Sequence, residues 1–353
     1  LLIILDEPTA TLDPACTREV LETLKKLKSE QNISIIIIEH RLEKLAPLSD
    51  RLLFMDKGKI ISESASSKFF PTYVPAGKGG GKITWQQPEE RASAIQKKEK
   101  APLLSVEKLC AGYEGRDVLH EISFSAYPGE TLAVMGDNGS GKSTLLLSLL
   151  GILKPSRGKI YLNKEDITDM KVARRAQEIG LNFQNPNHQL FENTVAREAK
   201  LPSLFLSKDS PEEIECKVDQ LLTEFGLYRY KDHNPFTLSL GEKKRLALVS
   251  VLAYSPLVLV LDEPLVGQDS GRLDLLMTAL QKHCARGGVT LMVCHEPGVV
   301  ISCCQRILFL GEGKLLIDAA VPEALVRLAQ MGREEYLPMG YKLTTPGERG
   351  GFK

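Results

Sequence analysis

The sequence predicts an α/β fold in which helices cover a mainly parallel β-sheet, and three observations support this prediction. Two uninterrupted apolar runs, within residues 1–8 and 257–264, have the length of strands buried on both faces, which is typical of parallel sheets. Further apolar runs of strand length occupy residues 33–38, 289–293 and 306–310. A glycine-rich loop at residues 136–143 lies between an apolar strand and a helix, as in units that bind phosphate.

Two parts of the chain repeat one another. The tripeptide Asp-Glu-Pro ends an apolar run at residues 6–8 and again at residues 262–264. Nearly the same offset relates further pairs, which are Asp13 and Asp269, His40 and His295, and the segments 51–60 and 306–315. A repeat over such a distance indicates two copies of one domain. The phosphate-binding loop, however, precedes the second copy alone.

The repeat predicts how the chain is organised. Residues 1–62 correspond to the C-terminal part of a first domain, residues 63–102 to a linker, residues 103–340 to a complete second domain, and residues 341–353 to a tail. Glycine and proline break the pattern in the linker, and its run AGKGGGK lacks the strand and helix that a second phosphate-binding loop would need. From the second copy, we expect about 100–200 further residues upstream, roughly one domain's worth.

The composition is that of an ordinary globular protein. Hydrophobic residues make up 43% and charged residues 25% of the 353 residues, both common values. Forty-five basic residues balance 45 acidic ones, so the overall charge does not indicate a nucleic-acid partner. No apolar run approaches the ~20 residues that span a bilayer, so a membrane role would come through a partner. The seven cysteines lack paired spacing, which favours reduced cytosolic thiols over disulfides.

The loop at residues 136–143 matches the pattern G-x-x-x-x-G-K-[ST], and its flanking strand and helix supply the context that the motif requires. Its glycines allow backbone N–H groups to curl around phosphate oxygens. We expect Lys142 to reach the β- and γ-phosphates and the Ser143 hydroxyl to bind Mg²⁺. The predicted ATP-binding residues here are Gly136, Asp137, Asn138, Gly139, Ser140, Gly141, Lys142, Ser143 and Thr144.

Acidic residues and a histidine follow the apolar strands of the second copy. Asp262 is placed to hold the magnesium ion through water, and Glu263 to polarise the attacking water. His295 ends another strand, at the carboxyl edge where ligands bind in open α/β sheets. A single histidine is usually structural, but its repetition as His40 favours a functional role. The predicted catalytic residues are therefore Lys142, Glu263 and His295.

Residues 238–245, Leu-Ser-Leu-Gly-Glu-Lys-Lys-Arg, resemble the LSGGQ-type signature of ABC ATPases. With the other motifs, they make residues 1–60 and 103–320 similar to that family. The resemblance implies a P-loop NTPase (RecA-like) core with an antiparallel β subdomain and a helical subdomain, and hydrolysis of ATP with Mg²⁺.

The resemblance also implies roles for single residues. Tyr113 would stack on adenine, and Gln184 would be the Q-loop glutamine that contacts Mg²⁺ and senses a transmembrane partner. Asp269 lies where the D-loop belongs, although its sequence departs from the usual form, which Ala10–Asp13 follows closely. The counterparts in the first copy are Asp6, Glu7, Asp13 and His40.

In this family ATP is sandwiched between two domains, so each site is composite. The signature residues would be Ser239, Leu240, Gly241 and Glu242. Their helix N-terminus would grip the γ-phosphate of a nucleotide bound to the opposing domain. Leu240 stands where the family usually has glycine and Glu242 where it has glutamine, which leaves the helix amides intact. The site built on Lys142 would then need the missing half of the first ATPase domain as its partner.

Residues 183–191, Phe-Gln-Asn-Pro-Asn-His-Gln-Leu-Phe, are similar to a stretch of energy-coupling-factor and cobalt-type importer ATPases, and Thr-Val-Ala-Arg-Glu at 194–198 also fits. This implies a subunit at the cytoplasmic face of the cell membrane that powers uptake of a vitamin or metal ion. Its partners would be an integral-membrane coupling protein, whose coupling helices enter a groove near residues 184–191, and a substrate-capture subunit. A simpler interpretation makes Phe183, Leu190 and Phe191 core residues, but it does not account for the polar residues between them.

Two other functions stay open. A soluble tandem ABC ATPase acting on ribosomes or DNA typically has a long basic helical linker, whereas residues 63–102 are broken by glycine and proline; we therefore expect no nucleic-acid partner. A catalytically silent nucleotide-binding fragment would not need Lys142, Glu263 and His295. The sequence shows no pocket for a transported substrate.

Overall fold

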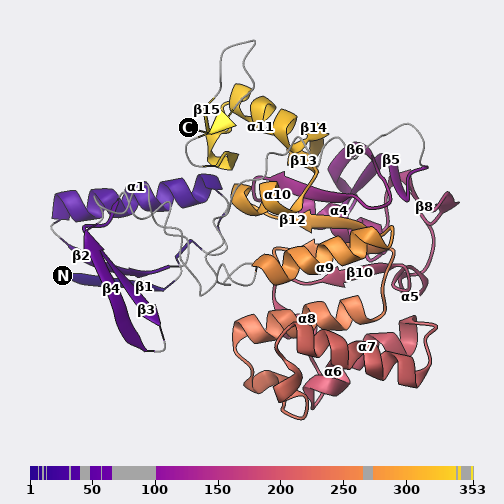
Figure 1. The fold of residues 1–353 in the computed structure, drawn as a ribbon. Helices are drawn as coiled ribbons and strands as arrows, with labels where there is room; N and C mark the ends of the chain where they lie inside the picture. The colour runs from indigo at the N-terminus through magenta and orange to yellow at the C-terminus, as the bar shows by residue number, and fades with distance from the viewer. Residues whose placement is uncertain are drawn as a thin grey trace. The chain divides into compact units, whose positions relative to one another are not determined.

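The computed structural model describes residues 1–6, 8–9, 12, 14–31, 33–39, 48–56, 58–65, 101–264, 273–338, 341–342 and 351–352. The chain divides into two compact units. Among the described residues, those up to 65 belong to the first unit and those from 101 onwards to the second (Figure 1).

The first unit holds two small sheets and one helix in its described part. Its elements are β1 (Leu2–Asp6), α1 (Pro14–Gln31), β2 (Ser34–Ile38), β3 (Arg51–Asp56) and β4 (Lys59–Ala65). Strands β1 and β2 pair in parallel, and β3 and β4 form an antiparallel hairpin. Gly58 turns this hairpin with a φ of 75°, in the left-handed region that favours glycine. The strand expected at residues 33–38 is confirmed as β2.

The second unit is built around a six-stranded sheet. Its strands are β7 (Thr131–Gly136), β10 (Ile179–Asn182), β11 (Val258–Asp262), β12 (Val289–Val293), β13 (Arg306–Gly311) and β14 (Lys314–Ala320). Their order is β10-β11-β12-β7-β13-β14. All neighbours are parallel except β13 and β14. The carboxyl ends of five strands therefore share one edge, where ligands bind in open sheets.

A second sheet, a group of helices and a short antiparallel pair of strands, β15 (Tyr341–Lys342) and β16 (Gly351–Phe352), complete the described part of this unit (Figure 1). The antiparallel sheet has the order β6-β5-β8-β9, with β5 at Leu104–Tyr113, β6 at Arg116–Ala126, β8 at Arg157–Leu162 and β9 at Glu165–Asp166. The helices are α4 (Lys142–Leu150), α5 (Val172–Arg175), α6 (Val195–Leu206), α7 (Pro211–Glu224), α8 (Leu240–Ala253), α9 (Leu273–Ala285), α10 (Pro297–Cys303) and α11 (Val321–Gln330). The predicted core with an antiparallel subdomain and a helical subdomain is confirmed.

The central sheet separates two apolar cores. On β7, Ala133 and Met135 contribute to one core, whereas Leu132 and Val134 contribute to the other. Successive side chains of a strand point to opposite faces, so a strand covered on both sides must be apolar throughout. The continuous apolar runs in the sequence follow from this double burial.

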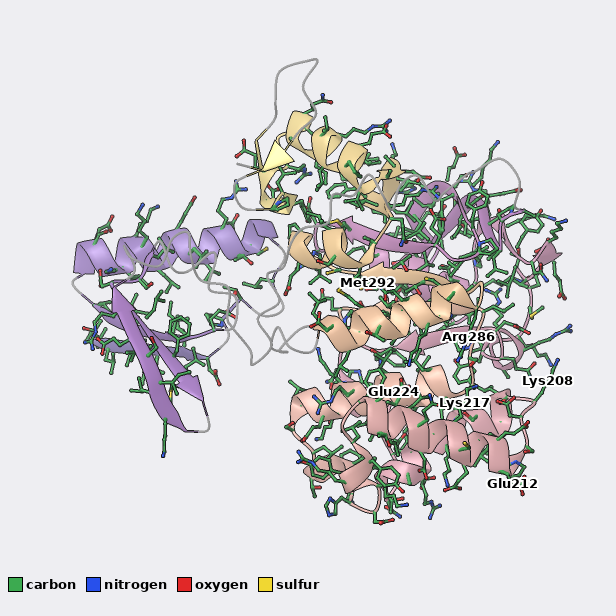
Figure 2. All side chains as sticks on the ribbon, in the orientation of Figure 1. Lys208, Glu212, Lys217, Glu224, Arg286 and Met292 are labelled. Atoms are coloured by element: carbon green, nitrogen blue, oxygen red, sulfur yellow. The ribbon has the colours of Figure 1, made fainter. Side chains whose placement is uncertain are left out.

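Helix α7 shows how the helical subdomain buries one face. Ser210 and the third helical residue, Glu213, form a reciprocal capping box at its start, which satisfies two backbone donors. Ile214, Val218 and Leu222, spaced four residues apart, are buried and form the stripe expected of an amphipathic helix. Glu212, Lys217 and Glu224 carry the polar side of the same helix (Figure 2).

The strand pairing of the first unit reappears in the second. Leu2 lies opposite Ser34 at the start of β1 and β2, and Val258 lies opposite Val289 at the start of β11 and β12. Both hairpins, β3–β4 and β13–β14, also carry a register irregularity at the corresponding position. These shared registers support the interpretation of two copies of one domain.

The prediction that β1 is a buried strand is wrong for alternate positions. The exposed fraction is 54% for Leu2 and 64% for Ile4, whereas Val258 and Val260 at the matching positions of β11 are fully buried. In the second unit β10 and β7 flank the corresponding pair and helices cover it. The described part of the first unit provides no such flanking strands for β1 and β2.

None of the helices in the described part of the chain combines the length and the apolar character needed to cross a bilayer.

Candidate nucleotide-binding site

The glycine-rich loop joins the central strand β7 to helix α4. Gly136 and Gly141 have φ angles of 141° and 101°, which disfavour any residue with a Cβ atom. A Cβ on Gly136 would lie 2.2 Å from the carbonyl oxygen of Leu310, and one on Gly141 would lie 2.5 Å from Leu119 Cδ2. The loop therefore depends on glycine for backbone conformation and for space, as the sequence predicted.

Lys142 turns back over the loop that precedes it. Its Nζ donates hydrogen bonds to the carbonyl oxygens of Gly136 and Asp137, both at 2.8 Å, and the side chain is buried. These contacts place a positive charge at the loop, next to the first turn of α4. Ser143 is exposed and Thr144 is buried.

The donors present fit a bound phosphate group. Ser140 Oγ is buried and has no hydrogen-bond partner among the described residues. A buried hydroxyl without a partner costs about 1–3 kcal/mol, and a phosphate oxygen would satisfy it. The glycine backbone, the Lys142 ammonium and the start of α4 add further donors and positive potential.

Gln184, Glu263 and His295 meet beside this loop, although they follow three different strands. Gln184 Nε2 donates to Glu263 Oε2 at 2.8 Å, and His295 Nε2 lies 3.2 Å from Glu263 Oε1. Glu263 takes a φ of 45°, a left-handed conformation that costs about 1–3 kcal/mol in a non-glycine residue. Its amide donates to the carbonyl oxygen of Val293 at 3.1 Å, which holds the carboxylate between β11 and β12. The structure thus brings three predicted site residues together.

Asp262 lies one residue before this cluster and is partly buried. Burial raises the pKa of its carboxyl group above the ordinary 3.8, and the charge of Glu263 raises it further. Lys142 and His295 act in the opposite direction, so both lie within electrostatic range of Asp262. A bound divalent cation would relieve this unfavourable charge.

We expect Asp262→Asn to raise the melting temperature of the nucleotide-free protein at neutral pH. The raised pKa means that the ionised carboxylate destabilises the fold. This loss of stability develops as the pH rises from the ordinary pKa through the folded-state pKa. Below the ordinary pKa both proteins are neutral here, so the difference should vanish. Thermal unfolding of both proteins from acidic to neutral pH measures the difference in melting temperature. Equal melting temperatures at neutral pH would contradict the raised pKa of Asp262.

The signature residues begin helix α8 in the helical subdomain. Ser239 is the N-cap, and its amide and hydroxyl both donate to Glu242 Oε2, at 2.9 and 2.8 Å. Burial opposes ionisation of Glu242, but the hydrogen bonds from Ser239 hold the pKa of its carboxyl group below the ordinary value. The Glu242 carboxylate therefore forms part of the cap at the start of α8.

Gln189 links the segment after Gln184 to helix α8. Its Oε1 accepts from the Phe183 amide at 3.3 Å, and its Nε2 donates to the Ala247 carbonyl oxygen at 2.9 Å and to Ser250 Oγ at 3.2 Å. Sequence analysis assigned no role to Gln189. No local pattern distinguishes Gln189 from the other polar residues at 184–188.

We expect Gln189→Glu to loosen this link selectively. Glutamate can still accept from the Phe183 amide, but it loses both donated bonds and sets a carboxylate against the Ala247 carbonyl oxygen. The free energy of unfolding should fall by about 1–3 kcal/mol, and amide hydrogen exchange should rise in residues 183–189. Gln220→Glu, which alters an exposed contact with Glu224 at 3.0 Å, is the matched control; equal effects of both changes would refute the special position of Gln189.

The described structure bears on only some of the other predicted residues. Tyr113 ends β5 with 48% of its surface exposed, and its role at adenine stays a prediction. Asp6 ends β1 in the first unit. Glu7, Asp13, His40 and Asp269 lie outside the described residues.

Sequence analysis missed a lysine near the carboxylates. Lys244, in the first part of α8, is buried, and its charge opposes the burial that raises the pKa of Asp262. It sits two residues beyond the signature, but no local pattern distinguishes it from the exposed lysines of the chain. Only the packing of α8 brings it within range of β11.

The stretch 183–191 divides between core and surface. Leu190 is buried in the core, as the simpler interpretation required, but Phe183 and Phe191 are 36% and 66% exposed. Asn185 caps the short 3-10 turn Pro186–His188. Phe183, which directly precedes Gln184 in the sequence, and Phe191 thus expose apolar side chains.

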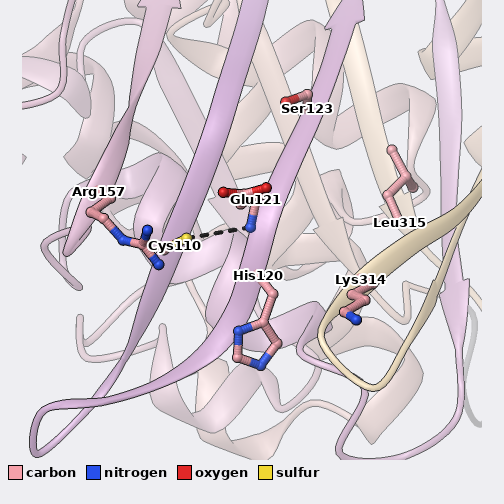
Figure 3. A pocket seen from close by; sticks show the side chains of 7 residues that line it. All are labelled: Cys110, His120, Glu121, Ser123, Arg157, Lys314 and Leu315. Atoms are coloured by element: carbon pink, nitrogen blue, oxygen red, sulfur yellow. Dashed lines mark hydrogen bonds between the residues drawn. The ribbon is translucent and has the colours of Figure 1, made fainter.

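A separate open pocket of about 560 Å³ lies over the antiparallel sheet (Figure 3). His120, Glu121 and Arg157 line it together with Lys314. The amide of Glu121 donates to Cys110 Sγ at 3.3 Å. The pocket shares no residue with the predicted nucleotide site, and its charges are mixed.

Comparisons with known proteins agree with the geometry of the site. Residues 119–266 match the model of the ABC transporter family. The chain is 31% identical over 382 residues to an ABC transporter ATP-binding protein of Methanosarcina mazei, covering 96% of this chain and 65% of that protein. It is 33% identical over 369 residues to the HMP/thiamine import ATP-binding protein YkoD of Bacillus subtilis, covering 98% and 65%.

Solved structures show the same relationship. CbiO1 of Clostridium perfringens, described as part of the ABC transporter complex CbiONQ, is 30% identical with a TM-score of 0.58, covering 66% of this chain and 94% of that chain. The dimeric ATP-binding cassette MJ0796 bound to ADP and phosphate is 25% identical with a TM-score of 0.57, covering 62% and 98%. The chain spans 62–65% of the length of the first curated relatives that it matches. By its motifs, its fold and these similarities, the chain belongs to the ABC transporter ATP-binding proteins.

Proposed function

We propose that the protein hydrolyses ATP to drive an energy-coupling-factor type importer. The observation that carries this proposal is the meeting of Gln184, Glu263 and His295 beside the Lys142 loop. ATP supplies the phosphoanhydride bond, and Mg²⁺ would balance its charge. The chain's own residues then bind the phosphates and position a water molecule.

The residues of the site divide between binding the phosphates, binding Mg²⁺ and activating water. The loop amides, the Ser140 hydroxyl and Lys142 bind the phosphates. Ser143, Gln184 and Asp262 offer the oxygen donors that Mg²⁺ prefers. Glu263 accepts a proton from the attacking water. His295 and Gln184 hold the carboxylate in place.

The proposed partners are an integral-membrane coupling protein and a substrate-capture subunit, at the cytoplasmic face of the membrane. The name of YkoD supports an importer, and CbiO1 is described as part of an ABC transporter complex. Phe183, which precedes Gln184, and Phe191 are exposed and are suited to receive an apolar helix of the coupling protein. The transported vitamin or metal ion would be selected by the capture subunit.

The proposed composite site also needs a second domain. Among the described residues, no strand flanks β1 and β2, and Leu2, Ile4, Ile36 and Ile38 are about half exposed or more. This exposure supports a larger first ATPase domain that would cover them. Such a domain would supply the signature that faces Lys142.

Co-purification tests the importer directly. The protein is expressed with the membrane protein encoded beside it, extracted in detergent and captured through a tag on the membrane protein. We expect a stable complex whose ATPase activity depends on both components. A variant with Phe191→Asp should lose the complex while retaining ATP binding. Failure of the intact protein to associate with any such membrane protein would overturn the importer assignment.

A further inference from the structure

A segment near the C-terminal end of the described chain contacts the phosphate-binding loop. After α11, the short 3-10 turn Glu334–Tyr336 brings Tyr336 next to the loop. The Tyr336 hydroxyl donates to Asp137 Oδ1 at 2.8 Å, and Arg333 Nη1 lies 3.0 Å from Asp137 Oδ2. Both oxygens of one carboxylate are thus engaged by residues almost 200 positions away in the sequence.

Packing sets the position of this segment. Tyr336 is fully buried, and its ring meets Phe309 of β13 edge to face, with centroids 5.0 Å apart. Gly332 takes a φ of 71° after α11, and the Arg333 amide donates to the Leu328 carbonyl oxygen at 2.9 Å. The chain therefore turns sharply at the end of α11 and is anchored to the sheet that carries the loop.

The charge of Asp137 explains why such a contact matters. Asp137 is the second residue of the loop, so its carboxylate lies in the structure that is proposed to bind a polyanion. Like charges in close proximity repel. In the structure the carboxylate faces Tyr336 and is paired with Arg333, while its backbone carbonyl oxygen accepts from Lys142 at 2.8 Å. The same residue is therefore held at its side chain and at its backbone.

We propose that Arg333 and Tyr336 are positioning residues of the nucleotide site. Arg333 neutralises the Asp137 carboxylate, and Tyr336 directs it away from the proposed phosphate position and fixes the loop. The segment 333–336 thereby sets the affinity of the loop for nucleotide. The effect on nucleotide affinity rests on the proposed function, whereas the fixing of the loop by Arg333 and Tyr336 does not depend on nucleotide.

Two variants separate the charge from the hydrogen bond. Tyr336→Phe removes the hydroxyl and retains the ring that packs on Phe309. Arg333→Met removes the charge and retains an apolar stem. Each should raise the Kd for Mg-ATP about three- to tenfold, the size expected of one hydrogen bond or one partly exposed ion pair. High salt should shrink the effect of Arg333→Met, because salt screens the unpaired carboxylate, but not that of Tyr336→Phe.

A double variant tests the role of the Arg333 charge. In the Arg333→Met background, Asp137→Asn should restore most of the lost affinity, because it removes the carboxylate that has lost its partner. Arg327→Met is the matched control, since Arg327 pairs with the exposed Glu323 on α11. It should leave the Kd unchanged. No restoration by Asp137→Asn, or an equal effect of Arg327→Met, would overturn the proposed role of Arg333.

Hydrogen exchange tests the inference without nucleotide. In the free protein, Tyr336→Phe and Arg333→Met should both accelerate amide exchange in residues 137–141, whereas Arg327→Met should not. Unchanged exchange in that loop would overturn the inference whether or not ATP binds. Faster exchange combined with no ATP binding by the unmodified protein would instead uphold the positioning role and reject the proposed function.

Discussion

Replacing Lys142 by alanine should abolish tight binding of ATP. The ammonium group is buried and held at 2.8 Å from the carbonyl oxygens of Gly136 and Asp137, where it would oppose the charge of the phosphates. Removing one partner from a buried charged contact costs about 2–5 kcal/mol, which corresponds to a loss of affinity of at least about 30-fold. Calorimetric titration with Mg-ATP measures the change.

The same lysine also supports the loop through its hydrogen bonds to Gly136 and Asp137, so the experiment needs a stability control. Lys154→Ala is suitable, because Lys154 follows the same helix α4 but forms an exposed ion pair with Asp169 at 2.8 Å. It should bind ATP as the unmodified protein does. Melting temperatures of both variants show whether either has lost its fold. A folded Lys142→Ala protein with unchanged affinity would remove Lys142 from the site.

Replacing Glu263 by glutamine should preserve ATP binding and slow hydrolysis by roughly 10²–10⁴-fold, which is the usual contribution of a general base. The amide oxygen can still accept the hydrogen bond from Gln184, but the side chain can no longer take a proton from water. Single-turnover hydrolysis and nucleotide binding, measured on the same preparation, separate the two steps. Glu224→Gln on α7, where Glu224 pairs with Lys282 at 2.8 Å, is the control.

The outcome of this second experiment also bears on His295. If Glu263 is the base, the histidine 3.2 Å away acts through it, so His295→Ala should slow hydrolysis less when Glu263 is already glutamine. A Glu263→Gln protein with near-normal turnover would instead favour His295 as the group that accepts the proton. The sum of the two single effects in the double variant would indicate that the residues act independently.

Local chemistry made much of this molecule predictable. The glycines of the loop and the Asp-Glu-Pro strand ends are patterns within short segments, and backbone geometry explains them. The repeat between the two halves can likewise be read directly from the sequence. The capping box of α8 could also have been foreseen, because Ser239 and Glu242 have the serine-to-glutamate spacing of such boxes.

The sequence by itself determined the α/β class, the loop that binds phosphate and the residues at the ends of the strands. The tertiary structure alone decided which distant side chains complete the site. Asp137 meets Arg333 and Tyr336, Gln189 meets α8, and Lys244 comes within range of Asp262. These contacts depend on how whole helices and strands pack. No periodicity or spacing along a chain encodes the distance between two surfaces that fold against each other.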